Sequence, residues 1–200
     1  AALVVTLAVS IHGWQWIGER RALAQLPPSM AGAPNVLLIV LDTVRADSLS
    51  LYGYERPTTP NLERLAKTGV RFERAISASP WTLPSHASMF TGRWPNELSA
   101  NWEKPLDGTY PTLAEFLTAH GYATAGFVAN TYYCGYELGL SRGFEHYEDY
   151  VVSPREVLIS SSLARSVINS GTVRRLLGYY DSFIRKSAAT INADFLRWLS

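Results

Sequence analysis

Apolar runs alternate with helix-like segments along the chain from residue 35 onward. Residues 35–41 (NVLLIVL) and residues 122–130 (YATAGFVAN) are continuous or nearly continuous apolar runs. Runs of this length are typical of strands buried on both faces, as in a parallel sheet covered by helices. Helix start signals lie between them: Thr59 precedes a proline, and Thr112 forms a capping box with Glu115. This order of strands and helices predicts an α/β fold with a mainly parallel sheet.

Further elements are expected in the remaining segments. A helix is predicted to start near Pro84 and to end at Gly92, and residues 70–77 begin with strand-like alternation. Residues 151–200 are expected to be largely helical and mildly basic, with a last helix whose apolar positions are Ile191, Phe195 and Leu199.

The first residues have a different pattern. Residues 1–18 are almost entirely apolar, with Trp14 and Trp16 near the end of the run, where an interfacial aromatic belt would lie. We therefore predict a truncated transmembrane helix over 1–18, with a buried core helix as the alternative. A linker is predicted over 19–34, and the domain itself over 35–200.

Composition narrows the class of partner. The chain has 200 residues, 47% of them hydrophobic, and a formal net charge of +1. This nearly balanced charge gives no indication of a nucleic-acid partner. Cys134 is the single cysteine, so the chain contains neither an internal disulfide nor a cysteine-based zinc motif.

Asp42 is the first candidate for chemistry. It directly follows the apolar run at 35–41, at the predicted carboxyl end of a buried strand, where open α/β sheets bind ligands. A carboxylate buried there needs a partner, and Arg45 or a metal ion would supply one. The alternative is that Asp42 serves as the N-cap of the turn that follows.

Thr82 is the second candidate. It lies just before the predicted helix at Pro84, where the first N–H groups and the helix dipole favour a tetrahedral anion such as sulfate or phosphate. A divalent cation shared with Asp42 would lower the pKa of the threonine hydroxyl and make it a nucleophile. Without a metal, Thr82 is simply a helix cap.

His86, four residues later, can bind the anion or act as an acid or base, or it can be an ordinary polar residue of a first helical turn. Ser85 is an alternative nucleophile, but the chain lacks the G-x-S-x-G motif and an identifiable third residue of a hydrolase triad.

With these residues in place, the chain resembles the sulfatases of the alkaline phosphatase superfamily over about residues 34–150. The segment NVLLIVLDTVRADSLSLYGY is similar to the family's first strand and metal-binding loop, and SASPWTLPSHASMFTGRWP is similar to its signature. The segments TLAEFLTAHGYATAGFVAN and GLSRGFEHYEDY together resemble the helix, the strand and the Gly-Phe segment downstream. The resemblance implies a three-layer α/β/α catalytic domain, of which this chain would be the N-terminal part.

The resemblance also implies roles for single residues. Asp42 would be a metal ligand, Thr82 would occupy the nucleophile position and also touch the metal, and Arg93 and Asn130 would bind substrate. The metal would be divalent, Ca²⁺ or Mg²⁺ with carboxylate ligands, and Zn²⁺ or Mn²⁺ stay open. Asp42 and Thr82 alone are too few ligands for tight binding, and the family's remaining ligands are expected outside these 200 residues.

Several positions depart from the family pattern. Leu41 stands where many sulfatases have a second aspartate, His86 replaces the signature arginine, and Asn130 replaces a lysine. The family oxidises a cysteine or serine to formylglycine, whereas the β-carbon of Thr82 carries a methyl group, so no formylglycine is expected.

The resulting hypothesis is a sulfatase-like hydrolase that cleaves a sulfuric ester with a metal-activated nucleophile. The first alternative is a membrane-anchored phospho-headgroup transferase or phosphoric ester hydrolase of the same superfamily, and the second is a non-catalytic member or an inactive fragment. The expected substrate is a small-molecule, carbohydrate or lipid ester, with no nucleic acid. The expected location is membrane-associated, with the catalytic domain periplasmic or extracellular.

Overall fold

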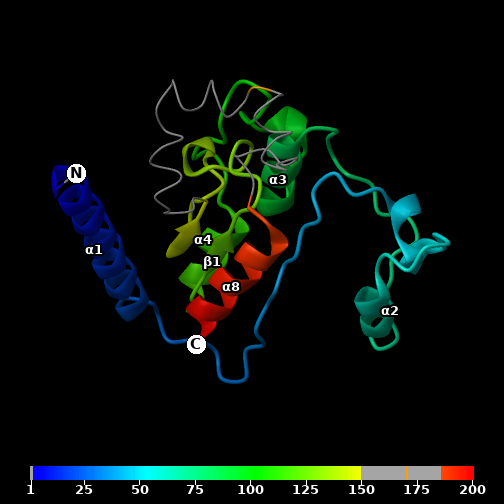
Figure 1. Cartoon of the computed structure of the whole chain (residues 1–200), viewed down its shortest axis with the longest axis horizontal. Helices are drawn as coiled ribbons and strands as arrows, with labels where there is room; N and C mark the ends of the chain where they lie inside the picture. Colours follow the sequence, from blue (N-terminus) through cyan, green and yellow to red (C-terminus); the bar gives the residue numbers. More distant parts are fainter. Residues whose placement is uncertain (1, 150–169, 171–185) are drawn as a thin grey trace.

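The computed structural model describes residues 2–149, 170 and 186–200. Helices from residues 82–119 and 188–199 lie near a small sheet, while the first helix and the helix at residues 60–66 lie apart from it (Figure 1). The chain opens with a long helix, α1 (Ala2–Ala24). Further α-helices are α2 (Pro60–Ala66), α3 (Thr82–Thr91), α4 (Leu113–Ala119) and α8 (Ala188–Leu199). Short 3-10 helices cover Ala46–Ser48, Ser50–Tyr52, Pro95–Glu97 and Tyr136–Leu138. The predicted last helix is confirmed as α8, while the predictions for 151–169 and 171–185 lie outside the described residues.

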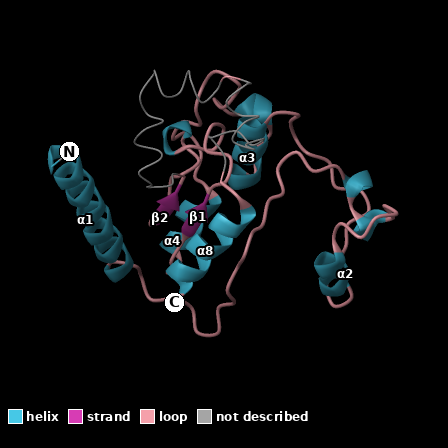
Figure 2. Ribbon diagram, in the orientation of Figure 1, coloured by secondary structure: helices cyan, strands magenta, loops and turns pink. Residues whose placement is uncertain are grey.

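The sheet contains two parallel strands, β1 (Ala125–Phe127) and β2 (His146–Glu148), which lie beside α4 and α8 (Figure 2). Ala125 pairs with His146, and Phe127 pairs with Glu148. β1 falls inside the predicted strand 122–130, so the α/β class with parallel pairing is confirmed at this level. β2 was not predicted, because its three residues mix polar and aromatic side chains.

The prediction of a buried strand over 35–41 is wrong for this structure. The segment is extended but belongs to no sheet, and its side chains are exposed, with Leu37 64% and Ile39 68% accessible. A strand needs a neighbouring strand to take up its backbone hydrogen bonds. Among the described residues no strand pairs with this segment. The alternating segment 70–77 forms no strand either, and Val70 is exposed.

A small lobe formed by residues 46–73 lies apart from the sheet, at the right of Figure 1. Its two ends are joined by hydrogen bonds from Tyr52 Oη to the carbonyl of Phe72 (3.0 Å) and from Arg71 Nη1 to the carbonyl of Leu51 (2.9 Å). Thr59 is the one buried residue of this lobe. The lobe is therefore held by polar contacts rather than by an apolar core.

The apolar core lies under α3. Its buried members come from α3 and from the loops that follow it, and Phe90, Leu98, Val128 and Leu138 pack against them. Those buried members are Leu83, Ala87, Ala100, Leu106, Cys134 and Leu140. Because one face of α3 is fixed in this core, the position of its first turn is fixed as well.

Helix α1 extends past the predicted end of the membrane-like segment at residue 18. None of the described helices combines the length and the apolar character that crossing a bilayer requires. The structure thus does not support a membrane-like helix over 1–18, since His12 and Gln15 interrupt the apolar run and Glu19 follows it. Glu19 contacts the body of the molecule: its carboxylate lies 3.0 Å from His146 Nδ1 and accepts a 3.0 Å hydrogen bond from Trp198 Nε1.

Candidate functional site

The first turn of α3 presents Thr82. The helix begins at Thr82, two residues before the predicted start at Pro84, and Trp81 is its N-cap with extended backbone. Gly92 ends the helix with a left-handed φ of 67°, as its position in the sequence predicts. Pro84 has no N–H, the N–H of Ser85 donates to the carbonyl of Trp81 (3.1 Å), and the N–H groups of Thr82 and Leu83 have no partner within the helix. The end of α3 that carries Thr82 therefore favours an anion.

Three polar side chains from distant parts of the chain meet at this helix end. Thr82 Oγ1 donates to Asp42, at 3.2 Å from Oδ2 and 3.4 Å from Oδ1. Asn130 Nδ2 donates to the same Oδ2 at 2.8 Å. All three side chains are half-buried. The structure thus brings Asp42, Thr82 and Asn130 together, although 40 and 88 residues separate Asp42 from the other two.

The backbone next to Asp42 is strained. Thr43 has a φ of 60°, and it is the one non-glycine residue with positive φ among the described residues. A β-branched residue in the left-handed region costs about 1–3 kcal/mol, and such strain is concentrated at functional sites. The strained residue Thr43 turns the chain sharply after the exposed segment 35–41, directly after Asp42. The hydrogen bonds to Asp42 help to offset this cost.

The other half of the site rests on the turn after β1, in which Cys134 is buried. The N–H of Cys134 donates to the carbonyl of Asn130 (3.0 Å), and Tyr147 Oη donates to the carbonyl of Cys134 (2.7 Å). Burial raises the pKa of the Cys134 thiol to about 12, with a smaller contribution from the negative charge of Asp42. Burial also raises the pKa of Tyr147. Both groups stay neutral at physiological pH, so they support Asn130 without adding charge to the site.

His86 faces the same helix end with one of its two nitrogens already bonded. Nδ1 lies 2.8 Å from the carbonyl of Thr82. Since a carbonyl only accepts, Nδ1 carries the hydrogen in this contact, and Nε2 is left for a ligand. His120 makes the same contact with the carbonyl of Phe116 in α4, which shows that the contact itself is a general helical feature. A role for His86 in chemistry must therefore act through Nε2.

Arg93 is not brought to the site. It follows the C-terminal end of α3, eleven residues after Thr82, so the length of the helix separates the two residues. Its guanidinium lies 4.7 Å from the ring centre of Tyr110 and 3.8 Å from the carboxylate of Glu97. Its predicted substrate-binding role stays a prediction, and these contacts give it a structural role here.

The ligand types offered by Asp42, Thr82 and Asn130 suit a hard divalent cation, but the three residues supply too few ligands to hold one. Carboxylate, hydroxyl and amide oxygens of the three site residues are ligands that Ca²⁺ and Mg²⁺ prefer, while Zn²⁺ favours nitrogen and sulfur. Both cations need about six ligands. In the part of the chain that the structure describes, no group of three or more histidine, cysteine or acidic residues could hold a metal ion.

The fold and the site together define an α/β protein with a hydroxyl nucleophile candidate at a helix N-terminus, next to a carboxylate. Comparison with known proteins gives the family: the Sulfatase family model matches residues 34–192. The chain belongs to the sulfatase family. No solved structure matches it significantly.

Curated relatives agree with this assignment over about half of the chain. The chain is 39% identical over 103 residues to arylsulfatase A of Bos taurus, covering 47% of this chain and 20% of that protein. It is 34% identical over 107 residues to human steryl-sulfatase (48% and 18%) and 34% identical over 97 residues to an N-acetylgalactosamine-6-O-sulfatase of Bacteroides thetaiotaomicron (46% and 19%). The chain thus spans about a fifth of the length of these relatives.

Some features of the site were not found by reading the sequence. The hydrogen bond between Asn130 and Asp42 joins positions 88 residues apart, and no sequence pattern at either residue indicates that they contact each other. The strain at Thr43 has no compositional signal, because threonine is not a residue type that favours positive φ. The aromatic residues beside the site did leave a signal, since Trp81 adjoins Thr82 and Tyr132 and Tyr133 closely follow Asn130.

Proposed function

We propose that this chain carries the nucleophile of a hydrolase that cleaves sulfuric esters. The observation that carries the proposal is the hydrogen bond from Thr82 Oγ1 to Asp42 at the N-terminal end of α3. Membership of the sulfatase family supports the sulfuric ester as substrate. Activity, substrate and location of the whole protein are parts of this proposal, because the chain spans about a fifth of its relatives' length.

The first step is binding of the ester's sulfuryl oxygens. The free N–H groups of the first turn of α3 donate to these oxygens, and the helix dipole adds about half a positive charge there. Asn130 already donates one hydrogen of its amide to Asp42, and the second hydrogen stays on the same nitrogen for the substrate. Binding thus places sulfur next to Thr82 Oγ1.

The chemical step uses the contact between Thr82 and Asp42. Asp42 accepts the hydroxyl proton while the bond from Oγ1 to sulfur forms and the bond from sulfur to the ester oxygen breaks. The leaving oxygen takes a proton from His86 or from water and departs as an alcohol. Water then attacks the sulfur and the bond from sulfur to Oγ1 breaks, so that sulfate is released. The proton held by Asp42 returns to Oγ1, and the proton lost by the attacking water passes to the neutral His86 or to solvent.

His86 is proposed as the group that binds the anion or protonates the leaving oxygen. The carbonyl of Thr82 keeps Nδ1 protonated, so Nε2 can donate only when the ring is the imidazolium form. The Nε2 lone pair of the neutral ring can accept a proton instead, which suits activation of the water.

A divalent cation would be held by Asp42 and Thr82, with further ligands from residues other than those described. When bound, it would lower the pKa of the threonine hydroxyl and offset the charge of the ester. Formylglycine is not proposed as a cofactor, because oxidation of threonine would give a ketone rather than an aldehyde.

The test is turnover by the full-length protein with Mg²⁺ or Ca²⁺ on an aryl sulfate and an aryl phosphate. Thr82→Ala should lower kcat/KM by about a thousandfold or more, because it removes the nucleophile. Thr82→Ser keeps the hydroxyl and should retain activity. Thr68→Ala is the matched control, since the hydroxyl of Thr68 only donates to the carbonyl of Leu65 at the surface. Full turnover of both esters by Thr82→Ala would overturn the assignment.

The second candidate is transfer or hydrolysis of a phosphoric ester, with a lipid headgroup donor as one form of substrate. The unmodified threonine at position 82 favours it, because threonine can form a stable phosphate ester directly. Incubation with labelled lipid donors, followed by mass spectrometry of the peptide around Thr82, tests it. A phosphothreonine favours transfer, while turnover of sulfate esters alone favours the first candidate. A protein that turns over neither ester is a non-catalytic member.

A further inference from the structure

Lys186 joins the two strands of the sheet at their carboxyl ends. Its backbone N–H donates to the carbonyl of Ala129 (3.0 Å), two residues after the end of β1. Its ammonium donates to the carbonyl of Glu148 (3.2 Å), the last residue of β2, and to the carboxylate of the same residue (3.2 Å). The carbonyl of Glu148 also accepts the N–H of Val128 (3.0 Å). The carboxyl ends of both strands are therefore tied to one residue.

The ammonium of Lys186 is buried although it carries a charge. Its side chain is 1% exposed, and a buried ammonium is costly unless it is paired. Asp194 of α8 lies 3.8 Å from Nζ, and its other oxygen pairs with Arg197 at 3.0 Å. The carboxylates of Glu148 and Asp194 are thus balanced by one buried and one exposed cation. An apolar group of the same volume is often as stabilising as such a cluster, so the cluster indicates a role in geometry.

Asn130 directly follows the residue whose carbonyl Lys186 binds. Its amide donates to Oδ2 of Asp42 at 2.8 Å. Asp42 follows an exposed segment, so it is held in the site by this hydrogen bond and by the one from Thr82. A shift of the backbone at Ala129 moves the amide of Asn130 relative to Asp42. The contact between the two halves of the site therefore depends on where Lys186 holds the chain.

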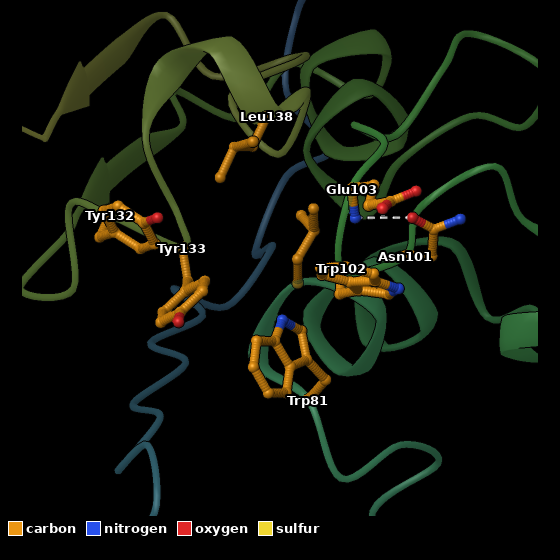
Figure 3. A pocket seen from close by; sticks show the side chains of 8 residues that line it. Trp81, Asn101, Trp102, Glu103, Tyr132, Tyr133 and Leu138 are labelled. Carbon is orange, nitrogen blue, oxygen red and sulfur yellow. Dashed lines mark hydrogen bonds between the residues drawn. The ribbon is translucent and has the colours of Figure 1, made fainter.

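The turn downstream of Asn130 is fixed by different contacts. The N–H of Cys134 donates to the carbonyl of Asn130 (3.0 Å). The ring of Tyr133 packs edge to face against Trp81, with ring centres 5.5 Å apart (Figure 3). Since Trp81 is the N-cap of α3, these contacts hold the turn to α3. Lys186 instead holds the chain that leads into the turn, and it ties that chain to β2 and to the start of α8.

We propose that Lys186 is a positioning residue for Asn130. It fixes the backbone at Ala129, so that the amide of Asn130 reaches Asp42 with one hydrogen and the ester with the other. The inference rests on the proposed function for the second hydrogen alone. The ammonium of Lys186 is bonded to β2, so the residue acts through the backbone and not on the ester itself.

The hydrogen bond from Asn130 to Asp42 can be observed without turnover. In the full-length protein labelled with ¹⁵N-asparagine, the two amide protons of Asn130 should resonate further apart than those of an exposed asparagine, because one is bonded to a carboxylate. Asn130→Ala assigns the pair by its loss. Lys186→Met keeps the length of the side chain without its charge, and it should reduce this separation. Lys186→Arg keeps the charge and should restore most of it.

A second variant and a control accompany this measurement. Glu148→Gln removes the charge that faces the ammonium and keeps the size of the side chain, so it should also reduce the separation, to a smaller extent. It carries the test if Lys186→Met does not fold. Arg197→Met is the matched control, because it removes the other cation beside Asp194 from a side chain that is 71% exposed. Its Asn130 resonances should be those of the parent. Spectra recorded well below the unfolding midpoint do not respond to a lower overall stability.

Kinetics of the full-length protein test whether Lys186 acts through Asn130. Lys186→Met should lower kcat/KM for an aryl sulfate by about tenfold or more, mainly through KM, since Asn130 binds the ester. In the Asn130→Ala background the same substitution should lower it by less than about twofold, because the amide that Lys186 positions is gone. A residue that only stabilises the fold would give the same factor in both backgrounds.

The outcomes separate this inference from the proposed function. Unchanged Asn130 resonances in Lys186→Met and Glu148→Gln would overturn the inference, and so would equal kinetic factors in the two backgrounds. A protein whose Asn130 resonances respond but which hydrolyses no ester retains the positioning role and loses the proposed chemistry. A protein that hydrolyses aryl sulfate through Thr82, with Lys186→Met as active as the parent, retains the chemistry and loses this inference.

Discussion

The two sides of the candidate site come from regions that are packed very differently. Thr82 and Asn130 belong to residues 81–149, which contain the buried apolar core, whereas Asp42 follows an extended segment whose apolar side chains face solvent. The first side is positioned by packing and the second by hydrogen bonds to Thr82 and Asn130. The three side chains of the site therefore meet although an apolar core supports only the Thr82 and Asn130 side.

The largest expected difference between the two regions is in stability. Leu140 is 1% exposed in the core, and Leu140→Ala should lower the free energy of unfolding by about 2–5 kcal/mol, since it leaves a cavity. Leu37→Ala removes the same atoms from a side chain that is 64% exposed, so it should change the free energy of unfolding by less than about 0.5 kcal/mol. Urea denaturation followed by circular dichroism measures both. Similar losses for the two variants would mean that 35–41 is packed in solution.

A medium effect is expected from a helix cap within the packed region. Thr112 is 1% exposed. Its hydroxyl oxygen accepts a hydrogen bond from the N–H of Glu115 (3.1 Å), and its hydroxyl hydrogen is donated to the carbonyl of Arg142 (2.8 Å). Thr112→Ala should therefore lower the free energy of unfolding by about 1–2 kcal/mol. Thr112→Ser keeps the hydroxyl and should recover most of this loss. An alanine variant as stable as the parent would contradict the role of this cap.

A smaller effect on stability, but a clear one on reactivity, is expected at Cys134. Its folded pKa is raised from 9.0 to about 12, so the stabilisation from its neutral thiol is present below pH 9 and is lost as pH rises towards 12. At pH 8 the folded protein should react with a thiol reagent far more slowly than the unfolded protein, because thiolate is the reactive form. Absorbance of a disulfide-exchange reagent measures the rates. Equal rates would show that the packed region opens readily.

The smallest effect is expected at Asp107, a fully exposed carboxylate within the packed region. Hydrogen bonds from the backbone and side chain of Thr109 lower its pKa, so its contribution to stability is present above its unfolded pKa and is lost as pH falls through the folded value. NMR titration of the side-chain carbonyl carbon should show a midpoint below the ordinary aspartate value. Asp107→Asn should hardly change the unfolding curve at neutral pH.

The helices could be predicted because their signals are local. The capping box at Thr112 and the left-handed Gly92 each act within one helical turn, and both are found where the sequence places them. The core covers α4 only in part, since Phe116 is 56% exposed and Ala114 is the buried residue of that helix.

The strands could not be predicted with the same success because pairing is not local. The run at 35–41 has the composition of a buried strand but has no neighbouring strand among the described residues, and β2 pairs with β1 although its sequence carries no strand signal. For the site, the position of Asp42 after an apolar run and of Thr82 at a helix start anticipated their meeting. Their catalytic and metal-binding roles stay predictions.

The exposed run from Val36 to Leu41 has a consequence for handling the chain by itself. Six consecutive β-branched or leucine residues without charge or proline make a segment that favours stacking of identical strands between molecules. Its unpaired backbone N–H and carbonyl groups act as a template for that stacking. The 200-residue chain should therefore precipitate as its concentration rises, through the same residues that lead to Asp42.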